Sequence, residues 1–357
     1  MSFNKEERKH IKTKIVEVIG EQIKDFIPQE FAKKHNISVQ TVYRYLKQLE
    51  NERHITIRQD GRRNEYKLFD KESTFGFDLK SITEDGVWSK HIHPLLKDIP
   101  EIAFKICNYA FTEMLNNAIE HSGGTHVDIC VRSNSYFTTI FIHDNGVGIF
   151  TKIAEAMKFE EKRFAVLELA KGKFTTDPES HTGEGIFFSS KASSVFNIYS
   201  DGLFFQPINR PDSEVDSMLM DRGRSSFNEN IAIINGGTTI MFIVLHSQRQ
   251  TLKELFDKYT NAPEDYGFTK TVVPVKLLEY GDDAALFTSR SQAKRLLVRF
   301  ERFKHIELDF TDIQEIGQGF ADEIFRVFSN QRPNISLTAT HCNEQVQYMI
   351  NRVKNSR

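Results

Sequence analysis

The sequence contains little cysteine and no long apolar stretch. Its three cysteines, Cys107, Cys130 and Cys342, are far apart in 357 residues, so we expect neither a disulfide framework nor a metal knuckle. The first residues form no apolar signal core, and no run approaches the roughly 20 apolar residues that a membrane span needs. These features predict a cytoplasmic protein without a membrane partner.

The chain also lacks a strong overall charge. A formal net charge of −2 argues against a general polyanion binder, but residues 1–69 contain 15 Lys+Arg and 10 Asp+Glu, which leaves +5 there and −7 elsewhere. A basic segment on an acidic body is typical of a small DNA-reading module. The length predicts two or three domains, and we expect an α+β, multidomain fold.

The basic segment, residues 1–69, has a regular order of expected elements. Ser38 is a suitable N-cap for its third helix, and the Asp-Gly pair predicts a hairpin turn. We expect three helices and two strands, at residues 11–23, 29–35, 39–53, 55–58 and 64–68. This order resembles a winged helix-turn-helix domain.

That resemblance implies double-stranded DNA as a partner, with the third helix in the major groove. The candidate residues for base contacts on this helix are Ser38, Gln40, Thr41 and Arg44, and those for phosphate or minor-groove contacts on the hairpin are Arg58, Arg62 and Arg63. An alternative is that the module docks a protein and its charges form a solvated face. A homodimer is the natural expectation for a regulator of this kind.

Residues 70–100 are expected to connect two domains. The pattern predicts a short strand near 75–79 and a helix near 87–96. His91 and His93 form an H-x-H pair, but no third ligand of suitable type is near in the sequence. We therefore interpret this segment as a connector that packs on the next domain.

Three motifs follow in residues 101–250. A long amphipathic helix carries Glu113 and Asn117, which are four residues apart and so project from one side. An alternating strand then leads into Asp144-Asn-Gly-Val-Gly-Ile149, and Thr182-Gly-Glu-Gly185 opens a further helix. In this order the motifs resemble the nucleotide-binding boxes of the GHKL ATPases, which include gyrase B, histidine kinases, MutL and the anti-sigma-factor kinases. The resemblance implies a Bergerat α/β sandwich that binds ATP and Mg²⁺.

The resemblance also implies roles for individual residues. Glu113 would orient or deprotonate the nucleophile, Asn117 would ligate magnesium, and Asn116 is a candidate auxiliary contact. Asp144 would accept the adenine amino group, and Thr238 would support it. Further expected nucleotide contacts come from Gly146, Gly148, Ile149, Thr182, Gly183 and Gly185. Lys171, in the lid segment (residues 150–182), either meets a phosphate or belongs to a solvated basic loop.

Residues 262–357 resemble the STAS fold of anti-sigma-factor antagonists. The strand at His305–Phe310 and the helix that follows it carry this resemblance. The antagonists have a phosphorylatable serine where this chain has Gly317-Gln-Gly319, so no hydroxyl acceptor is present there. We expect a STAS-like interaction or dimerisation module that offers a surface to a protein partner.

Two functions remain open from the sequence. The first is a DNA-binding transcriptional regulator whose nucleotide state controls DNA or partner binding, with slow ATP hydrolysis. The second is a serine/threonine protein kinase of the anti-sigma type that acts on a separate antagonist protein. A third hypothesis, an interaction protein with a degenerate site, is disfavoured because Glu113, Asn117 and Asp144 are all present.

Overall fold

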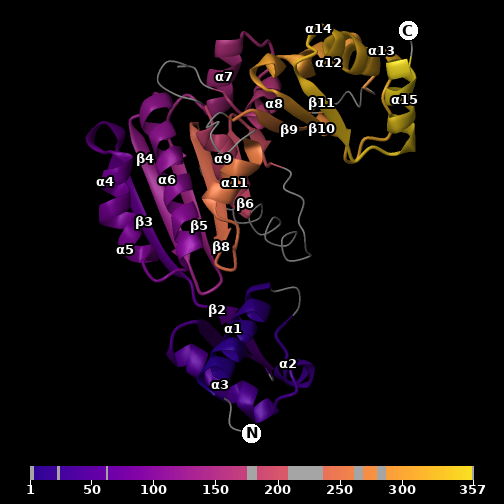
Figure 1. Ribbon diagram of the computed structural model, residues 1–357. Coiled ribbons are helices and arrows are strands. Elements are labelled where there is room, and N and C mark those ends of the chain that lie inside the picture. The colour runs from indigo at the N-terminus through magenta and orange to yellow at the C-terminus, as the bar shows by residue number, and fades with distance from the viewer. Residues whose placement is uncertain are drawn as a thin grey trace. The chain divides into compact units, whose positions relative to one another are not determined.

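The computed structural model describes residues 4–21, 25–61, 63–174, 183–207, 236–260, 268–279 and 287–355. It is a mixed chain of helices and sheets, consistent with the expected α+β, multidomain class (Figure 1). The chain divides into two compact units. The first comprises Met1–Gly146, Ser193–Ile198 and Asn209–Arg249, and the second comprises Val147–Ala192, Tyr199–Ile208 and Gln250–Arg357.

The amino-terminal part of the first unit contains three helices and a hairpin. They are α1 (Lys5–Glu21), α2 (Pro28–Lys34), α3 (Val39–Asn51), β1 (Ile55–Asp60) and β2 (Arg63–Leu68). Ser38 caps α3, because its Oγ accepts a hydrogen bond from the Thr41 backbone N at 3.2 Å. Strands β1 and β2 pair antiparallel up to Asp60 opposite Arg63, and Gly61 adopts φ 58° in the turn. The predicted element order of residues 1–69 is therefore present.

A six-stranded sheet runs in the order β3-β4-β5-β8-β6-β7. Its strands are β3 (Lys71–Asp78), β4 (His126–Ser133), β5 (Phe137–Asp144), β6 (Val195–Ser200), β7 (Leu203–Phe205) and β8 (Thr238–Leu245). Every residue of β8 is buried, and its six residues after Thr238 and Thr239 are all apolar. The neighbours β3–β4, β4–β5 and β5–β8 are antiparallel. Residues 71–78, which the sequence assigned to a connector, thus form the edge strand of this sheet.

Helix α6 (Glu101–His121) packs against β5 and β8 (Figure 1). Its buried stripe includes Ile106, Ala110, Met114 and Ala118, the 3.6-residue spacing that marks an amphipathic helix. The predicted helix at 87–96 is divided into three short helical elements, α4 (Glu84–Val87), η2 (Trp88–Ile92) and α5 (His93–Leu96). A 3₁₀ turn, η1 (Leu79–Ser81), precedes them, and α6 follows.

The second unit contains a three-stranded parallel sheet in the order β11-β10-β9. Its strands are β9 (Lys270–Pro274), β10 (His305–Asp309) and β11 (Ser336–Thr340). The helical elements that follow one another in this part are η3 (Val275–Glu279), α12 (Arg290–Leu297), η4 (Phe300–Arg302), α13 (Gln318–Asp322), η5 (Glu323–Phe328), α14 (Ser329–Gln331) and α15 (Glu344–Asn355). Residues 284–286 lie outside the described residues, and Phe287 forms one bridge with Ile316.

The second unit also contains α7 (Ile149–Met157), α8 (Arg163–Lys171), α9 (Gly185–Ala192) and α11 (Leu252–Tyr259). The described part of the lid segment, residues 150–174, therefore belongs to the same compact unit as the carboxy-terminal sheet. Among the described residues, no helix is both long enough and apolar enough to cross a membrane.

Candidate functional site

Asp144 is a buried carboxylate at the end of β5. Asp144 is only 6% exposed, and its Oδ1 accepts a hydrogen bond from the Gly146 backbone N at 2.9 Å. Burial raises the pKa of Asp144 to about 6, while backbone hydrogen bonds from Gly146 and Thr238 act in the opposite direction. An acceptor kept in a low-dielectric position can select one hydrogen-bond donor strongly.

The chain passes very close to Asp144 where β8 begins. Thr238 pairs with Asp144 in the β5–β8 register, and it is 7% exposed. A Cβ added to Gly237, which has φ 72°, would lie 1.8 Å from the Asp144 carbonyl oxygen. A Cβ added to Gly146 would lie 2.3 Å from the Ser122 carbonyl oxygen. Both glycines are thus required by the chain's own backbone. Gly237 was missed by the sequence analysis, although the Gly236-Gly237 pair before a strand is a recognisable signal.

Asn145 is a second residue that the sequence analysis missed. Its Oδ1 accepts hydrogen bonds from the backbone N of Thr125 at 2.8 Å and of His126 at 2.9 Å. These bonds fasten the loop after β5 to the beginning of β4. The position was overlooked because it is the variable one within the D-x-G-x-G pattern.

Helix α6 carries the predicted catalytic and metal-binding residues. Glu113, Asn116 and Asn117 are half-buried and flank the stripe that packs on β5 and β8. The first unit therefore contains the acid–amide pair on the helix that covers the two strands carrying Asp144 and Thr238. One carboxylate and one amide suit a magnesium ion, which keeps several waters and phosphate oxygens as ligands.

The loop after Asp144 continues into the second unit, where Asp201 fixes the beginning of α7. Asp201 Oδ2 accepts hydrogen bonds from the Thr151 backbone N at 3.1 Å and from Thr151 Oγ1 at 2.8 Å. Gly148, at φ 87°, lies so close that an added Cβ would be 2.5 Å from Asp201 Oδ2. Ile149 follows as the first residue of α7. Asp201 was not predicted, because it lies more than fifty residues beyond the motif that it supports.

The third motif is described in part. Gly183 has φ 70°, and Gly185 is the first residue of α9, so a helix amino terminus follows the motif, and backbone N–H groups at such a terminus can bind an anion. Thr182 lies outside the described residues.

Lys171 has a different environment from the one predicted. It is 0% exposed, and its Nζ lies 2.5 Å from Glu168 Oε1 and 2.9 Å from the Val298 carbonyl oxygen. Burial lowers the pKa of Lys171 to about 8, although Glu168 beside it favours the charged form. The residue is neither part of a solvated loop nor accessible to a phosphate in this structure, because its ammonium group is already enclosed by protein oxygens.

The predicted DNA-contacting residues are mostly exposed. Gln40 and Arg44 on α3 and Arg58 and Arg63 on the hairpin strands are all exposed, whereas Arg62 lies outside the described residues. Ser38 and Thr41 are joined by a 2.9 Å contact between their hydroxyl oxygens. These two hydroxyls therefore take part in the helix cap.

The turn at residues 317–319 is tightly packed. A Cβ added to Gly317 would lie 2.7 Å from Thr288 Cα, and one added to Gly319 would lie 3.0 Å from the Thr288 carbonyl oxygen. The Gly317 backbone N also donates to the Phe287 carbonyl oxygen at 2.7 Å. The sequence thus lacks a hydroxyl at these two positions, and at Gly317 the fold has no room for one without rearrangement.

The comparisons with known proteins concern this carboxy-terminal part. Residues 292–347 match the family model described as a STAS-like domain of unknown function (DUF4325). The matched segment runs from α12 to α15, so the expected STAS-like domain is supported there. No curated protein and no solved structure matches the chain.

Proposed function

We propose that this protein is an ATP-binding, slowly hydrolysing transcriptional regulator in which the nucleotide state controls DNA binding or a protein contact. The observation that carries the proposal is the buried Asp144. It is paired in register with Thr238, and both strands are covered by the helix that carries Glu113 and Asn117. A winged helix-turn-helix at residues 1–69 and a GHKL-type ATP-binding region at 101–250 form part of this proposal.

The residues present fit ATP and magnesium chemically. Asp144 would accept the adenine amino group, and its burial makes this bond selective. Asn117 would supply an amide oxygen to Mg²⁺, and Glu113 would hold or receive a proton from the attacking nucleophile. Magnesium, when bound, neutralises charge on the phosphates. Gly183 and Gly185 would offer backbone N–H groups to the phosphates at the start of α9.

A contact within the first unit supports a link to DNA binding. His54 Nδ1, in the turn after α3, lies 2.6 Å from Ser135 Oγ, in the turn between β4 and β5. Strand β5 runs from that turn to Asp144. A change at Asp144 could therefore reach α3 through one continuous strand. Gln40 and Arg44 on α3 and Arg58 and Arg63 on the hairpin are exposed. They would contact double-stranded DNA, most naturally in a homodimer.

The proposal is tested by measuring ATP affinity and by mobility shift of the gene's own upstream DNA with and without Mg-ATP. We expect micromolar-range ATP binding and a clear change in DNA affinity when Mg-ATP is added. ATP binding that alters neither DNA affinity nor oligomeric state would refute the regulatory function. Arg44→Ala provides a DNA-binding control, and Lys105→Ala, an exposed substitution on α6, provides a neutral one.

The alternative kinase function is separated by radiolabelled ATP. Label retained on a partner protein favours a serine/threonine kinase, whereas release of all label as phosphate favours hydrolysis. The packed Gly317 turn supports a separate acceptor in the kinase case, because it carries no hydroxyl group.

A further inference from the structure

Two charged residues of α8 are buried against the STAS-like domain. Glu168 is 1% exposed and Lys171 is 0% exposed, and such groups are tolerated in the interior only when they are paired. Arg299 Nη1 donates to Glu168 Oε2 at 3.0 Å, and Lys171 Nζ donates to the Val298 carbonyl oxygen at 2.9 Å. Both of these partners lie in the segment that matches the STAS-like family.

The STAS-like domain also satisfies the carboxy-terminal end of α8. The last carbonyls of a helix have no partners within the helix. Here Thr271 Oγ1 of β9 donates to the Lys171 carbonyl oxygen at 2.7 Å, and Arg299 Nη2 donates to the Gly172 carbonyl oxygen at 3.3 Å and to that of Lys173. Arg299 itself has φ 62°, an uncommon conformation for a bulky residue that persists only when its surroundings fix it.

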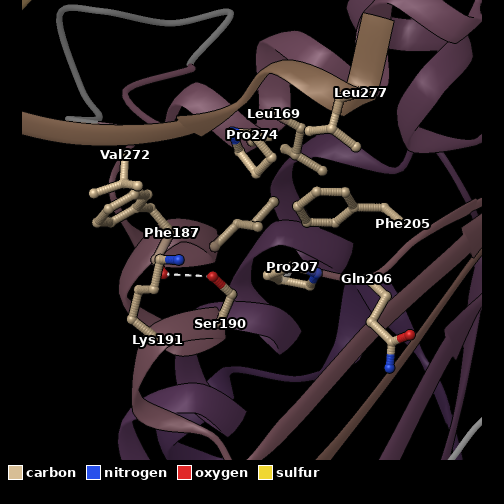
Figure 2. A pocket seen from close by; sticks show the side chains of 12 residues that line it. Leu169, Phe187, Ser190, Lys191, Phe205, Gln206, Pro207, Val272, Pro274 and Leu277 are labelled. Carbon is tan, nitrogen blue, oxygen red and sulfur yellow. Dashed lines mark hydrogen bonds between the residues drawn. The ribbon is translucent and has the colours of Figure 1, made fainter. Parts of the chain in front are cut away.

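The apolar part of the same contact encloses only a small cavity. Leu169 of α8, Phe187 of α9 and Val272 of β9 are among the residues that line a cavity of about 20 Å³, which is room for roughly one water molecule and opens in part to solvent (Figure 2). Glu168, Lys171 and Arg299 are directly paired beside it. The apolar packing and this charged group of three residues therefore both fix the position of α8.

We propose that the STAS-like domain holds α8 through Glu168, Lys171 and Arg299, so that the described lid segment and this domain respond together to nucleotide. In this proposal Lys171 attaches the lid segment to the STAS-like domain and does not bind a phosphate. The response to nucleotide rests on the proposed function, whereas the attachment of α8 does not.

The attachment is tested by hydrogen–deuterium exchange of the full chain without nucleotide. In Arg299→Met, residues 163–171 should exchange at least about tenfold faster, because the variant loses a charge-assisted bond and two carbonyl partners. Arg332→Met, an exposed substitution in the same matched segment, should leave this exchange unchanged. Equal exchange of residues 163–171 in Arg299→Met and the wild type would overturn the attachment.

A milder pair of variants keeps the test decisive if Arg299→Met does not fold. Thr271→Val removes only the bond to the Lys171 carbonyl oxygen and should accelerate exchange of residues 163–171 about fivefold. Thr338→Val, on the exposed side of β11, should have no such effect. An unchanged rate in Thr271→Val would contradict the role of β9 in holding α8.

The response to nucleotide is tested by exchange of α12 with and without Mg-ATP. We expect Mg-ATP to slow exchange in residues 290–297 of the wild type at least about threefold, and Arg299→Met to lose this response while keeping its ATP affinity within about threefold. An equal response in both proteins would overturn the coupling. Absence of ATP binding by the wild type would refute the proposed function and the coupling together, and the attachment would still be judged by residues 163–171 alone.

Discussion

Replacement of Asp144 by asparagine should weaken ATP binding and, at the same time, stabilise the nucleotide-free protein. Burial raises the pKa of this carboxyl from its ordinary value of 3.8 to about 6. A difference of about two pKa units corresponds to about 3 kcal/mol by which the fold disfavours the charged form. Asparagine has a similar shape, can still accept the Gly146 N–H through Oδ1, and never carries the charge.

The sign of the stability effect follows from protonation. Because the pKa is higher in the folded state, the carboxyl group favours folding below about pH 4, and this contribution is lost as the pH rises to about 6. Asp144→Asn should therefore match the wild type near pH 4 and exceed it above pH 6, by about 1 to 3 kcal/mol in free energy of unfolding. Urea denaturation at several pH values measures this difference.

The effect on ATP should have the opposite sign. A hydrogen bond to a carboxylate is about twice as strong as one to a neutral acceptor, so Asp144→Asn should bind ATP about tenfold more weakly at pH 7.5. At pH 5 only about a tenth of the wild-type carboxyl groups would be ionised, and the ratio of the two dissociation constants should approach one. Calorimetric titration gives both constants. The phosphates of ATP titrate identically with either protein. The ratio of the two dissociation constants therefore reports the effect of Asp144 alone.

Two results would refute this reasoning about Asp144. One is a ratio of dissociation constants that stays constant between pH 5 and pH 7.5, which would mean that the carboxylate does not contact the nucleotide. The other is a variant less stable than the wild type at pH 7.5, which would mean that the burial of this group does not disfavour its charge.

Three further predictions concern other parts of the chain. Glu113→Ala should keep ATP affinity within about threefold and lower phosphate release at least about 100-fold; normal hydrolysis would disprove its assignment as the base. Arg44→Ala should weaken specific DNA binding by about 1 to 3 kcal/mol, whereas Arg58→Ala should weaken all sequences alike and reduce the salt slope by about one; mobility shifts at several salt concentrations distinguish them. Gly237→Ala should lower the free energy of unfolding by clearly more than Gly236→Ala, because both have φ above 70° but only Gly237 would place a Cβ against the Asp144 carbonyl oxygen, at 1.8 Å. Equal losses in urea denaturation would show that the close approach is relieved at little cost.

Much of the local structure was predictable because it is encoded by neighbouring residues. The expected third helix at 39–53 is α3 at Val39–Asn51, with Ser38 as its cap, since a cap and an amphipathic stripe act within one or two turns. The strand near 75–79 in the connector and the strand at His305 were likewise found near their predicted positions. Of the predicted domains, the family comparison supports the STAS-like domain, at residues 292–347.

Contacts between distant residues were not predictable in the same way. Asp201 supports the Gly148 turn from more than fifty residues away, and the partner of β3 is β4, whose residues 126–133 are distant in the sequence. An edge strand needs only alternate apolar residues, and its pairing partner is chosen by the fold as a whole. Such long-range pairings carry no local signal.

The sequence by itself therefore determined the order of the helices and strands, the exposed basic side chains of residues 1–69, and the motif residues that make ATP and magnesium the natural proposal. Only the tertiary structure decided the protonation properties of Asp144 and the environment of Lys171. The pKa of a carboxyl depends on how far the folded chain excludes water from it, and Lys171 meets Val298 across 127 residues of sequence. From the sequence alone Lys171 could be taken for a phosphate ligand, but in the fold its Nζ contacts Glu168 of the same helix and the Val298 carbonyl oxygen of the STAS-like domain.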